Sequence, residues 1–227
     1  MKRGKNYDAA VKKVDRSKEY PAVEACSLVK EMKYAKFDET VEAHVRLNLK
    51  KSQTVRDTVL FPNQFRAEKR IVVFCKPDKA KEALEAGAME AGDDALIEKV
   101  KGGWLDFDVA VATPDMMKDV GKLGMVLGRR GLMPNPKTGT VTHDVASAIA
   151  ELRKGRTEFR SDKSSIVHIA VGKVSMEPAK IGENLEILLA EIARKRPSDT
   201  KGDFIQSVYV ASTMGPGVRV AAGKSER

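Results

Sequence analysis

Hydrophobic and polar residues alternate strictly around residue 45. Every second residue from Val41 to Leu49 is apolar, whereas the residues between them are polar or charged. A period of two places these sets on opposite faces of a β-strand. One apolar and one polar face is typical of an antiparallel sheet with one packed face and one wet face. We therefore predict a half-buried strand over residues 41–49.

Similar patterns return in the last third of the chain. Residues 158–160 and 166–171 are strand-like and flank the polar turn 161–165, which predicts a hairpin or a sheet edge. Apolar residues then recur at helical spacing from Ile181 to Ile192. This spacing predicts an amphipathic helix.

The predicted amphipathic helix ends before Pro197, which cannot continue it. Another strand is expected over residues 204–211, followed by a turn at 212–217. Near the other end of the chain, Pro21 suits the first turn of a helix that precedes the strand at 41–49.

The middle of the chain has a different pattern. Residues 71–75 and 109–112 are short, continuous apolar runs, which are typical of parallel strands buried on both faces. Helical patterns alternate with them. The helices are predicted at 79–86, at 94–101, from Thr113 onward, and at 144–154. Strand–helix alternation predicts a small α/β layer.

These patterns predict a discontinuous protein of two domains, combining α/β and α+β classes. Residues 1–66 and 157–227 form a split α+β domain around an antiparallel sheet. Residues 67–156 form an inserted, Rossmann-like α/β domain. The two crossings, near Pro62 and Gly155, are expected to act as a hinge.

Charge is distributed unevenly between these two parts. The chain has 41 Lys and Arg residues against 32 Asp and Glu, a formal net charge of +9. Residues 67–156 contain 15 basic and 14 acidic residues, whereas the remainder contains 26 and 18. A polyanion, nucleic acid before membrane, should therefore bind a surface built from the two ends.

Several function classes lack their sequence signatures. The middle has neither a phosphate-binding loop nor a dinucleotide glycine motif after a strand. The three histidines are scattered singly, and no Gly-x-Ser-x-Gly motif occurs. We expect no catalytic residue, no metal site and no cofactor. The glycine- and arginine-containing stretch 127–136 is predicted to be a rigid loop, serving either as a connector or as a contact loop.

The sequence shows neither a membrane-spanning segment nor a secretory signal. No stretch approaches the roughly 20 apolar residues that span a bilayer, and residues 1–14 lack the apolar segment of a secretory signal. Cys26 and Cys75, the two cysteines, do not make a disulfide framework. We expect a cytoplasmic protein with reduced thiols, no membrane partner, and a monomeric state when free.

Three segments combine cations, hydroxyls and flat or apolar tips. They are residues 36–42, residues 160–165 with His168 and Lys173 downstream, and residues 212–219. Lys and Arg bind phosphates, hydroxyls bind phosphate or the ribose 2′-OH, and Phe offers a stacking face. On composition alone, each segment fits an RNA contact or an ordinary turn.

Five sequence blocks, in order along nearly the whole chain, resemble the large-subunit ribosomal stalk protein family called L-one, of bacterial type. The blocks are Ala35–Glu42, Phe107–Asp115, Gly131–Lys137, Gly155–Lys163 and Ser212–Pro216. Five concordant blocks are far more specific than one short motif.

The resemblance implies binding to large-subunit rRNA (23S rRNA) at the mobile stalk near the tRNA exit site, help in releasing exit-site tRNA, and repression of the protein's own operon through its mRNA. By analogy, the RNA-binding residues are Lys36, Phe37, Thr40, Glu42, Arg160, Asp162, Lys163, His168, Lys173, Ser212, Thr213, Met214 and Gly215. The acidic Glu42 and Asp162 are expected to orient neighbouring cations or to accept ribose hydroxyls.

Two departures from the family pattern stand out. Arg129 occupies a position where the family usually has proline, which removes a rigid residue from the 127–136 loop and adds a charge to it. The segment 62–69 lacks the glycines that the family pattern leads one to expect, which would stiffen the hinge. Neither departure falls in the predicted RNA-binding set.

Two other function classes remain open from sequence. A nucleotide-dependent enzyme would use the middle α/β domain, and saturable binding of ATP or NAD would reveal it. A DNA-binding regulator would use the same basic surface, and competition between duplex DNA and structured RNA would distinguish it.

Overall fold

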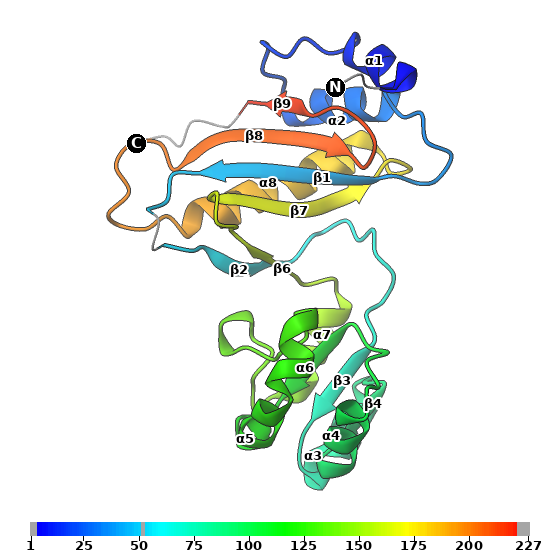
Figure 1. The fold of residues 1–227 in the computed structure, drawn as a ribbon, viewed down its shortest axis with the longest axis vertical. Helices are drawn as coiled ribbons and strands as arrows, with labels where there is room; N and C mark the ends of the chain where they lie inside the picture. The colour runs from blue at the N-terminus through cyan, green and yellow to red at the C-terminus, as the bar shows by residue number, and fades with distance from the viewer. Residues whose placement is uncertain (1–3, 51–52, 222–227) are drawn as a thin grey trace. The chain divides into compact units, whose positions relative to one another are not determined.

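The chain divides into two compact units, one of which is inserted into the sequence of the other (Figure 1). The computed structural model describes residues 4–50 and 53–221. One unit combines the chain up to Phe65 with the chain from Phe159, and the other comprises Arg66–Glu158. These divisions lie within two residues of the boundaries expected from sequence. The domain predicted from the two chain ends includes residues 1–3, 51–52 and 222–227, which lie outside the described residues.

A four-stranded antiparallel sheet organises the first unit. Its strand order is β7-β1-β8-β9. The strands are β1 (Thr40–Leu47), β7 (Ile166–Lys173), β8 (Ile205–Ser212) and β9 (Val218–Val220). β1, from the first part of the chain, pairs on both sides with strands from the last part. The alternation predicted for β1 is confirmed, since Val41, Ala43, Val45 and Leu47 are buried.

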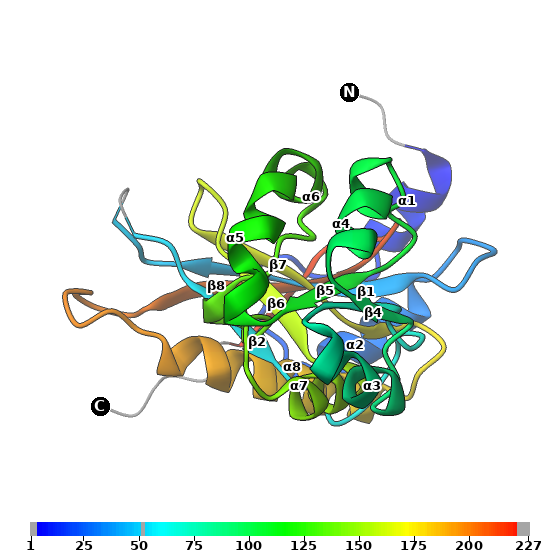
Figure 2. The same ribbon diagram turned by 90° about the horizontal axis from the view of Figure 1, so that it is seen from below.

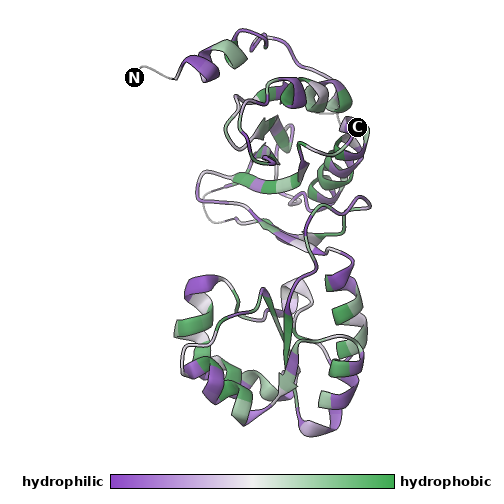
Figure 3. Cartoon of the chain, turned by 90° about the vertical axis from the view of Figure 1, so that its right-hand side faces the viewer, coloured by the Kyte–Doolittle hydropathy of each residue, from purple (hydrophilic) through white to green (hydrophobic). Residues whose placement is uncertain are grey.

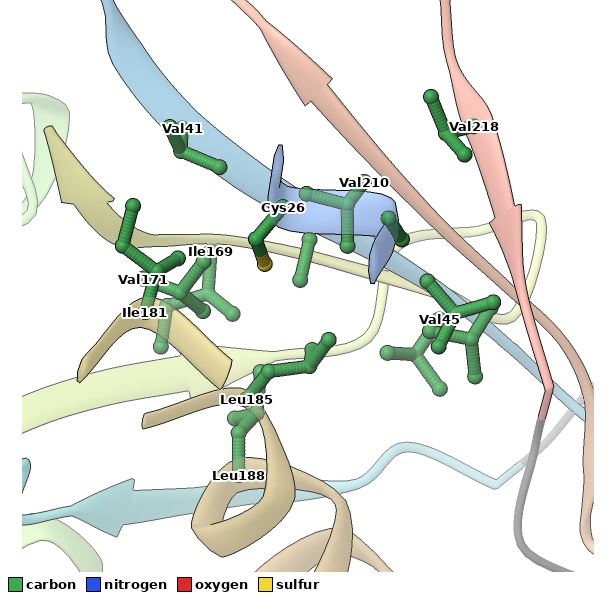
Figure 4. Packing of buried hydrophobic residues seen from close by; sticks show 14 of the residues in the cluster. Cys26, Val41, Val45, Ile169, Val171, Ile181, Leu185, Leu188, Val210 and Val218 are labelled. Atoms are coloured by element: carbon green, nitrogen blue, oxygen red, sulfur yellow. The ribbon is translucent and has the colours of Figure 1, made fainter. Parts of the chain in front are cut away.

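Two helices cover one face of this sheet (Figure 2). They are α2 (Ala22–Glu31) and α8 (Pro178–Arg194), and the short helix α1 (Lys5–Val11) belongs to the same unit. The predicted stripe on α8 is fully buried: Ile181, Leu185, Leu188 and Ile192. Burying each such side chain contributes about 1.5–3 kcal/mol. Figure 4 shows Ile181, Leu185 and Leu188 of this stripe on the side of the core that faces Cys26 of α2 and the valines of the sheet.

Asn184 of α8 is a polar residue inside this core, with 0% of its surface exposed. Its Oδ1 accepts from the Asn63 N–H at 3.2 Å, and its Nδ2 donates to the carbonyls of Asn63 and Val171, each at 2.9 Å. Buried polar groups need such partners. Asn184 therefore connects β7, an edge strand of the sheet, with the segment around Asn63, where the chain leaves the first unit.

The predicted hairpin at residues 158–171 is only partly present. β6 (Thr157–Arg160) pairs with β2 (Arg56–Val59), in a separate two-stranded sheet. β7 instead forms an edge of the four-stranded sheet, and the isolated bridge Ser161–Val167 connects the two. The alternative prediction of a sheet edge is correct. The short, polar β2 gave no signal from which this pairing could be predicted.

The second unit is a three-stranded parallel sheet between helices. The strand order is β4-β3-β5, with β4 (Glu90–Gly92), β3 (Ile71–Phe74) and β5 (Val109–Ala112). The predicted parallel pairing of the two apolar runs is confirmed. Figure 3 shows the central strands of this unit coloured as hydrophobic. The combined α/β and α+β class expected from sequence is therefore correct.

Helices lie on both faces of the parallel sheet (Figure 2). One core joins the sheet to α3 (Pro77–Glu85) and α7 (Val145–Arg153). The opposite core contains residues of α4 (Asp94–Lys101), α5 (Met117–Val120) and α6 (Gly124–Arg130). Short 3-10 turns, Pro114–Met116, Gly121–Leu123 and Pro136–Thr138, complete the unit.

The stretch 127–136 was predicted to be a loop throughout, and this is wrong for its first part. Leu127 to Arg130 form the last turn of α6, and Arg129 is a helical residue in that turn. The helix ends at Gly131, whose φ of 70° is left-handed and suits glycine. The loop proper begins there and contains Pro134.

Replacing Asn184 by Ala should destabilise the first unit by about 2–4 kcal/mol, because buried backbone groups of Asn63 and Val171 lose their partner. Amide hydrogen exchange along β7, together with urea unfolding, measures this loss. The matched control is Glu186→Ala, at an exposed position of the same helix. Equal stability of the two variants would contradict the fastening role of Asn184.

Candidate nucleic-acid interface

One group of predicted residues meets where β1 begins and β7 and β8 end. Thr40 is paired with Lys173, whose Nζ donates to Thr40 Oγ1 at 2.8 Å. On the other side of Thr40, the Thr213 N–H donates to the Thr40 carbonyl at 3.1 Å. Lys36 and Phe37 precede the strand, and the Phe37 side chain is 52% exposed. Three distant segments thus place cations, hydroxyls and an aromatic ring together.

The hydroxyl of Thr213 serves the fold as well as the surface. It accepts from the Thr40 N–H at 3.1 Å and donates to the Thr40 carbonyl at 3.3 Å. Thr213 therefore fastens its loop to the first residue of β1. Substituting valine here would disturb the end of the sheet, so Met214, whose side chain is 48% exposed, is the cleaner position for testing contact.

The loop after β8 is tightly closed by Ser212 and Gly215. Ser212 is buried, and its Oγ accepts from the Gly215 N–H at 3.2 Å. A Cβ atom at position 215 would lie 2.5 Å from that Oγ, closer than atoms can approach. A side chain at position 215 would therefore force the Ser212 hydroxyl to move and disturb its bond to the Gly215 N–H, and Ser212 acts from inside the loop rather than at its surface.

The second group of predicted residues lies in the turn between β6 and β7. Asp162 Oδ1 accepts from the N–H groups of Ser164 and Ile166, both at 2.8 Å. These bonds, the one from Ile166 first, hold the pKa of Asp162 below its usual value. Arg160 and Lys163 are exposed on either side of it. Asp162 therefore shapes the turn that presents the two cations.

β7 separates the two groups by its own length. It has eight residues, so its ends lie about 23 Å apart at roughly 3.3 Å per residue. His168 lies between them, 3.7 Å from Asp162 Oδ2 through its Nε2. The predicted set is therefore not one compact pocket. It follows the edge strand and β1 as an elongated strip.

His44 was not placed in the predicted set, yet it lies within this strip. Its Nδ1 is 2.8 Å from Nδ1 of His168, and the two rings meet edge to face. Burial lowers the pKa of His44, and the neighbouring His168 lowers it further. One ring must be neutral at Nδ1 to accept the proton of the other. The alternation that assigned His44 to the polar face of its strand was the available signal.

Glu42 occupies the same polar face, between Ala170 of β7 and Ala211 of β8 in register. It is half-buried, and it raises the pKa of His44 against the stronger lowering effects. The role expected of Glu42, orienting neighbouring cations or accepting ribose hydroxyls, stays a prediction.

The chemistry of this strip suits a polar, anionic polymer. It offers amines, a guanidinium, hydroxyls, imidazoles and two projecting apolar tips, which are the groups that bind phosphate, ribose and bases. Among residues 4–50 and 53–221, no cluster of three or more His, Cys, Asp or Glu side chains could hold a metal ion. Within the same ranges, every helix is too short or too polar to cross a membrane.

Comparisons with known proteins agree on one family. The profile of the "Ribosomal protein L1p/L10e family" matches residues 29–216. A protein of Treponema denticola named "Large ribosomal subunit protein uL1" is 66% identical over 220 residues, covering 97% of each chain. Proteins of the same name from Treponema pallidum and Borrelia hermsii are 59% and 58% identical. The first of these covers 100% of both chains, and the second covers 96% of this chain and 98% of its own.

These matches cover both units and all five sequence blocks from which the resemblance was drawn. The family consists of structural ribosomal proteins, so the alternative of a nucleotide-dependent enzyme is not supported. The chain belongs to the ribosomal protein L1 family and is a structural protein of the large ribosomal subunit.

Proposed function

We propose that the unit built from both chain ends binds large-subunit rRNA at the mobile stalk, near the tRNA exit site, within the cytoplasmic ribosome. The observation that carries this proposal is the meeting of Thr40, Lys173 and Thr213, which come from three distant segments and share hydrogen bonds. Family membership supplies the identity of the RNA, and the strip of cations, hydroxyls and rings supplies the chemistry.

The elongated form of the strip favours folded RNA over a small ligand. Two cationic groups about 23 Å apart span several phosphates of a helix, and the two apolar tips, Phe37 and Met214, lie beside one of these groups. In this proposal Lys36, Arg160, Lys163 and Lys173 bind phosphate. Phe37 and Met214 pack on bases or riboses, and Thr40 and Gly215 allow close approach of the sugar–phosphate chain.

We further propose that the same surface represses translation of the protein's own operon by binding a similar structure in its mRNA, and that the protein assists release of exit-site tRNA. The first idea follows from shared recognition, because an mRNA that mimics the rRNA site competes for the same side chains. The second rests on family membership and is assigned to no residue.

Competition binding tests the class of ligand. Full-length protein should bind a stalk rRNA fragment far more tightly than duplex DNA of equal length at the same salt concentration, and an operon leader mRNA should displace the rRNA. Preference for duplex DNA would favour a DNA-binding regulator instead. A leader mRNA that fails to displace rRNA would rule out the shared surface for repression.

Met214→Asp should weaken binding to the stalk fragment by about 1–3 kcal/mol, the usual size of a lost specific nucleic-acid contact. A carboxylate at an exposed tip also repels phosphate. Filter binding at fixed salt measures the change. The control is Met125→Asp in the second unit, where the methionine is 77% exposed. Equal losses in both variants would point to bulk charge rather than to a contact by Met214.

Lys36→Ala and Lys163→Ala should each reduce the slope of log affinity against log salt by about one, because each removes one phosphate contact and its released counterion. Binding titrations at several salt concentrations give the slope. Lys180→Ala, on the helix that covers the opposite face of the sheet, should leave it unchanged. A slope that is insensitive to Lys36 or Lys163 removes that residue from the phosphate contacts.

A further inference from the structure

Glu39 is a carboxylate buried at the meeting point of the three segments, with 0% of its surface exposed. Ionised side chains are rarely buried without partners. Its Oε2 accepts from the Met214 N–H at 3.0 Å, and its Oε1 accepts from the Ala35 N–H at 3.3 Å. Its backbone carbonyl also accepts from the Val174 N–H at 2.9 Å. One residue thus joins the start of β1, the end of β7 and the loop after β8.

Tyr34 binds the carbonyl of Met214, the loop residue whose N–H donates to Glu39. Its hydroxyl donates to the Met214 carbonyl at 2.5 Å. Both the N–H and the carbonyl of Met214 are therefore bound by side chains of the segment 34–39. Adjacent residues are held as well, since the N–H groups of Thr213 and Gly215 donate to the carbonyls of Thr40 and Ser212.

The Met214 side chain nevertheless remains half-exposed, with 48% of its surface accessible. A fixed backbone fixes the direction of the Cα–Cβ bond, so the exposed Met214 side chain starts from one defined position and direction. Glu39 has no exposed surface and so cannot itself contact RNA. Its carboxylate instead makes charge-assisted hydrogen bonds, which are stronger than neutral ones.

We propose that Tyr34 and Glu39 are positioning residues that fix the Met214 backbone before RNA arrives and so determine how the Met214 side chain meets it. This inference rests on the proposed binding of RNA by the Ser212–Gly215 loop. Fixing a contact residue in advance lowers the conformational entropy lost on binding. Loss of either side chain should therefore weaken RNA binding although neither residue belongs to the contact surface.

Tyr34→Phe is the cleanest test, because it removes one hydroxyl and keeps the ring. A double-mutant cycle combines it with Met214→Ala in the full-length protein, using a stalk rRNA fragment as the probe. Tyr34→Phe should weaken binding about threefold to tenfold in the natural background, and by less than about twofold when Met214 is already alanine. The salt slope should not change, because no cation is lost.

Amide hydrogen exchange of the free protein provides a readout that does not depend on RNA. Tyr34→Phe should accelerate exchange at Met214 and Gly215 and leave Val210, in the middle of β8, unchanged. The control is Tyr20→Phe, which removes a hydroxyl that accepts from the Asp15 N–H. This control should alter neither RNA affinity nor exchange in the loop.

Glu39→Gln provides an independent second variant. Glutamine has the same shape but only one acceptor oxygen, so one of the two N–H groups of Ala35 and Met214 would face an amide donor. Exchange at Met214 should accelerate here as well, and more strongly than in Tyr34→Phe, with thermal unfolding confirming that the variant folds.

The possible failures are distinguishable. Unchanged exchange at Met214 and Gly215 in both variants overturns the positioning role, whatever the RNA affinity. An equal loss of affinity from Tyr34→Phe with and without the Met214 side chain also overturns it. If exchange accelerates but Met214→Ala binds RNA normally, the contact assigned to Met214 under the proposed function is what fails, and the consequence for RNA binding fails with it.

Discussion

The pairing of β1 with β7 and β8 is the constraint on which the rest of the structure depends. Ala43 lies opposite Ile169 on one side and Val210 on the other, so a strand from the first part of the chain is enclosed by strands from the last part. Loop-closure entropy grows only slowly with loop length, so the intervening unit, residues 66–158, adds little to the cost of this pairing. The core beneath α2 and α8 offsets that cost.

The same pairing creates the candidate interface. Residues that precede β1, follow β7 and follow β8 meet only because these strands are in register. Within the interface, side chains divide by role. Thr213, Ser212, Asp162 and Glu39 bond to backbone groups and shape the loops, and of these Ser212 and Glu39 are buried. Lys36, Phe37, Lys163 and Met214 are exposed, and within the described part of the chain their side chains make no such bond to the loops. Recognition of RNA would thus depend in part on Ser212 and Glu39, two buried polar side chains that need not touch it.

Much of this arrangement could be predicted from the sequence because its signals are local. The alternation in β1, the apolar stripe on α8 and the continuous runs of β3 and β5 each follow from which faces are buried. The strands that were missed, β2, β4 and β9, are short and derive their structure from their partners, and the short helix α1 was missed as well. The turn of α6 at residues 127–130 was missed because the prolines farther along dominated the interpretation of that stretch.

The sequence was enough to predict which segments form the candidate site, but not how their residues contact one another in space. Family resemblance suggested Thr40, Lys173 and Thr213, yet only the register of the sheet shows that Thr213 bonds to Thr40. The bonds from Tyr34 and Glu39 to Met214 are tertiary contacts between residues more than 170 positions apart. Pattern analysis of one sequence contains no information on such contacts, so Tyr34 and Glu39 could not be found that way.

A nuclease footprint on whole large-subunit rRNA tests the central claim most directly. Full-length protein would be compared with a variant in which residues 67–156 are replaced by a short spacer, after circular dichroism has established that the variant is folded. If the two chain ends form the RNA-binding unit, both proteins should protect the same stalk nucleotides. A folded variant that protects none of them would contradict the account.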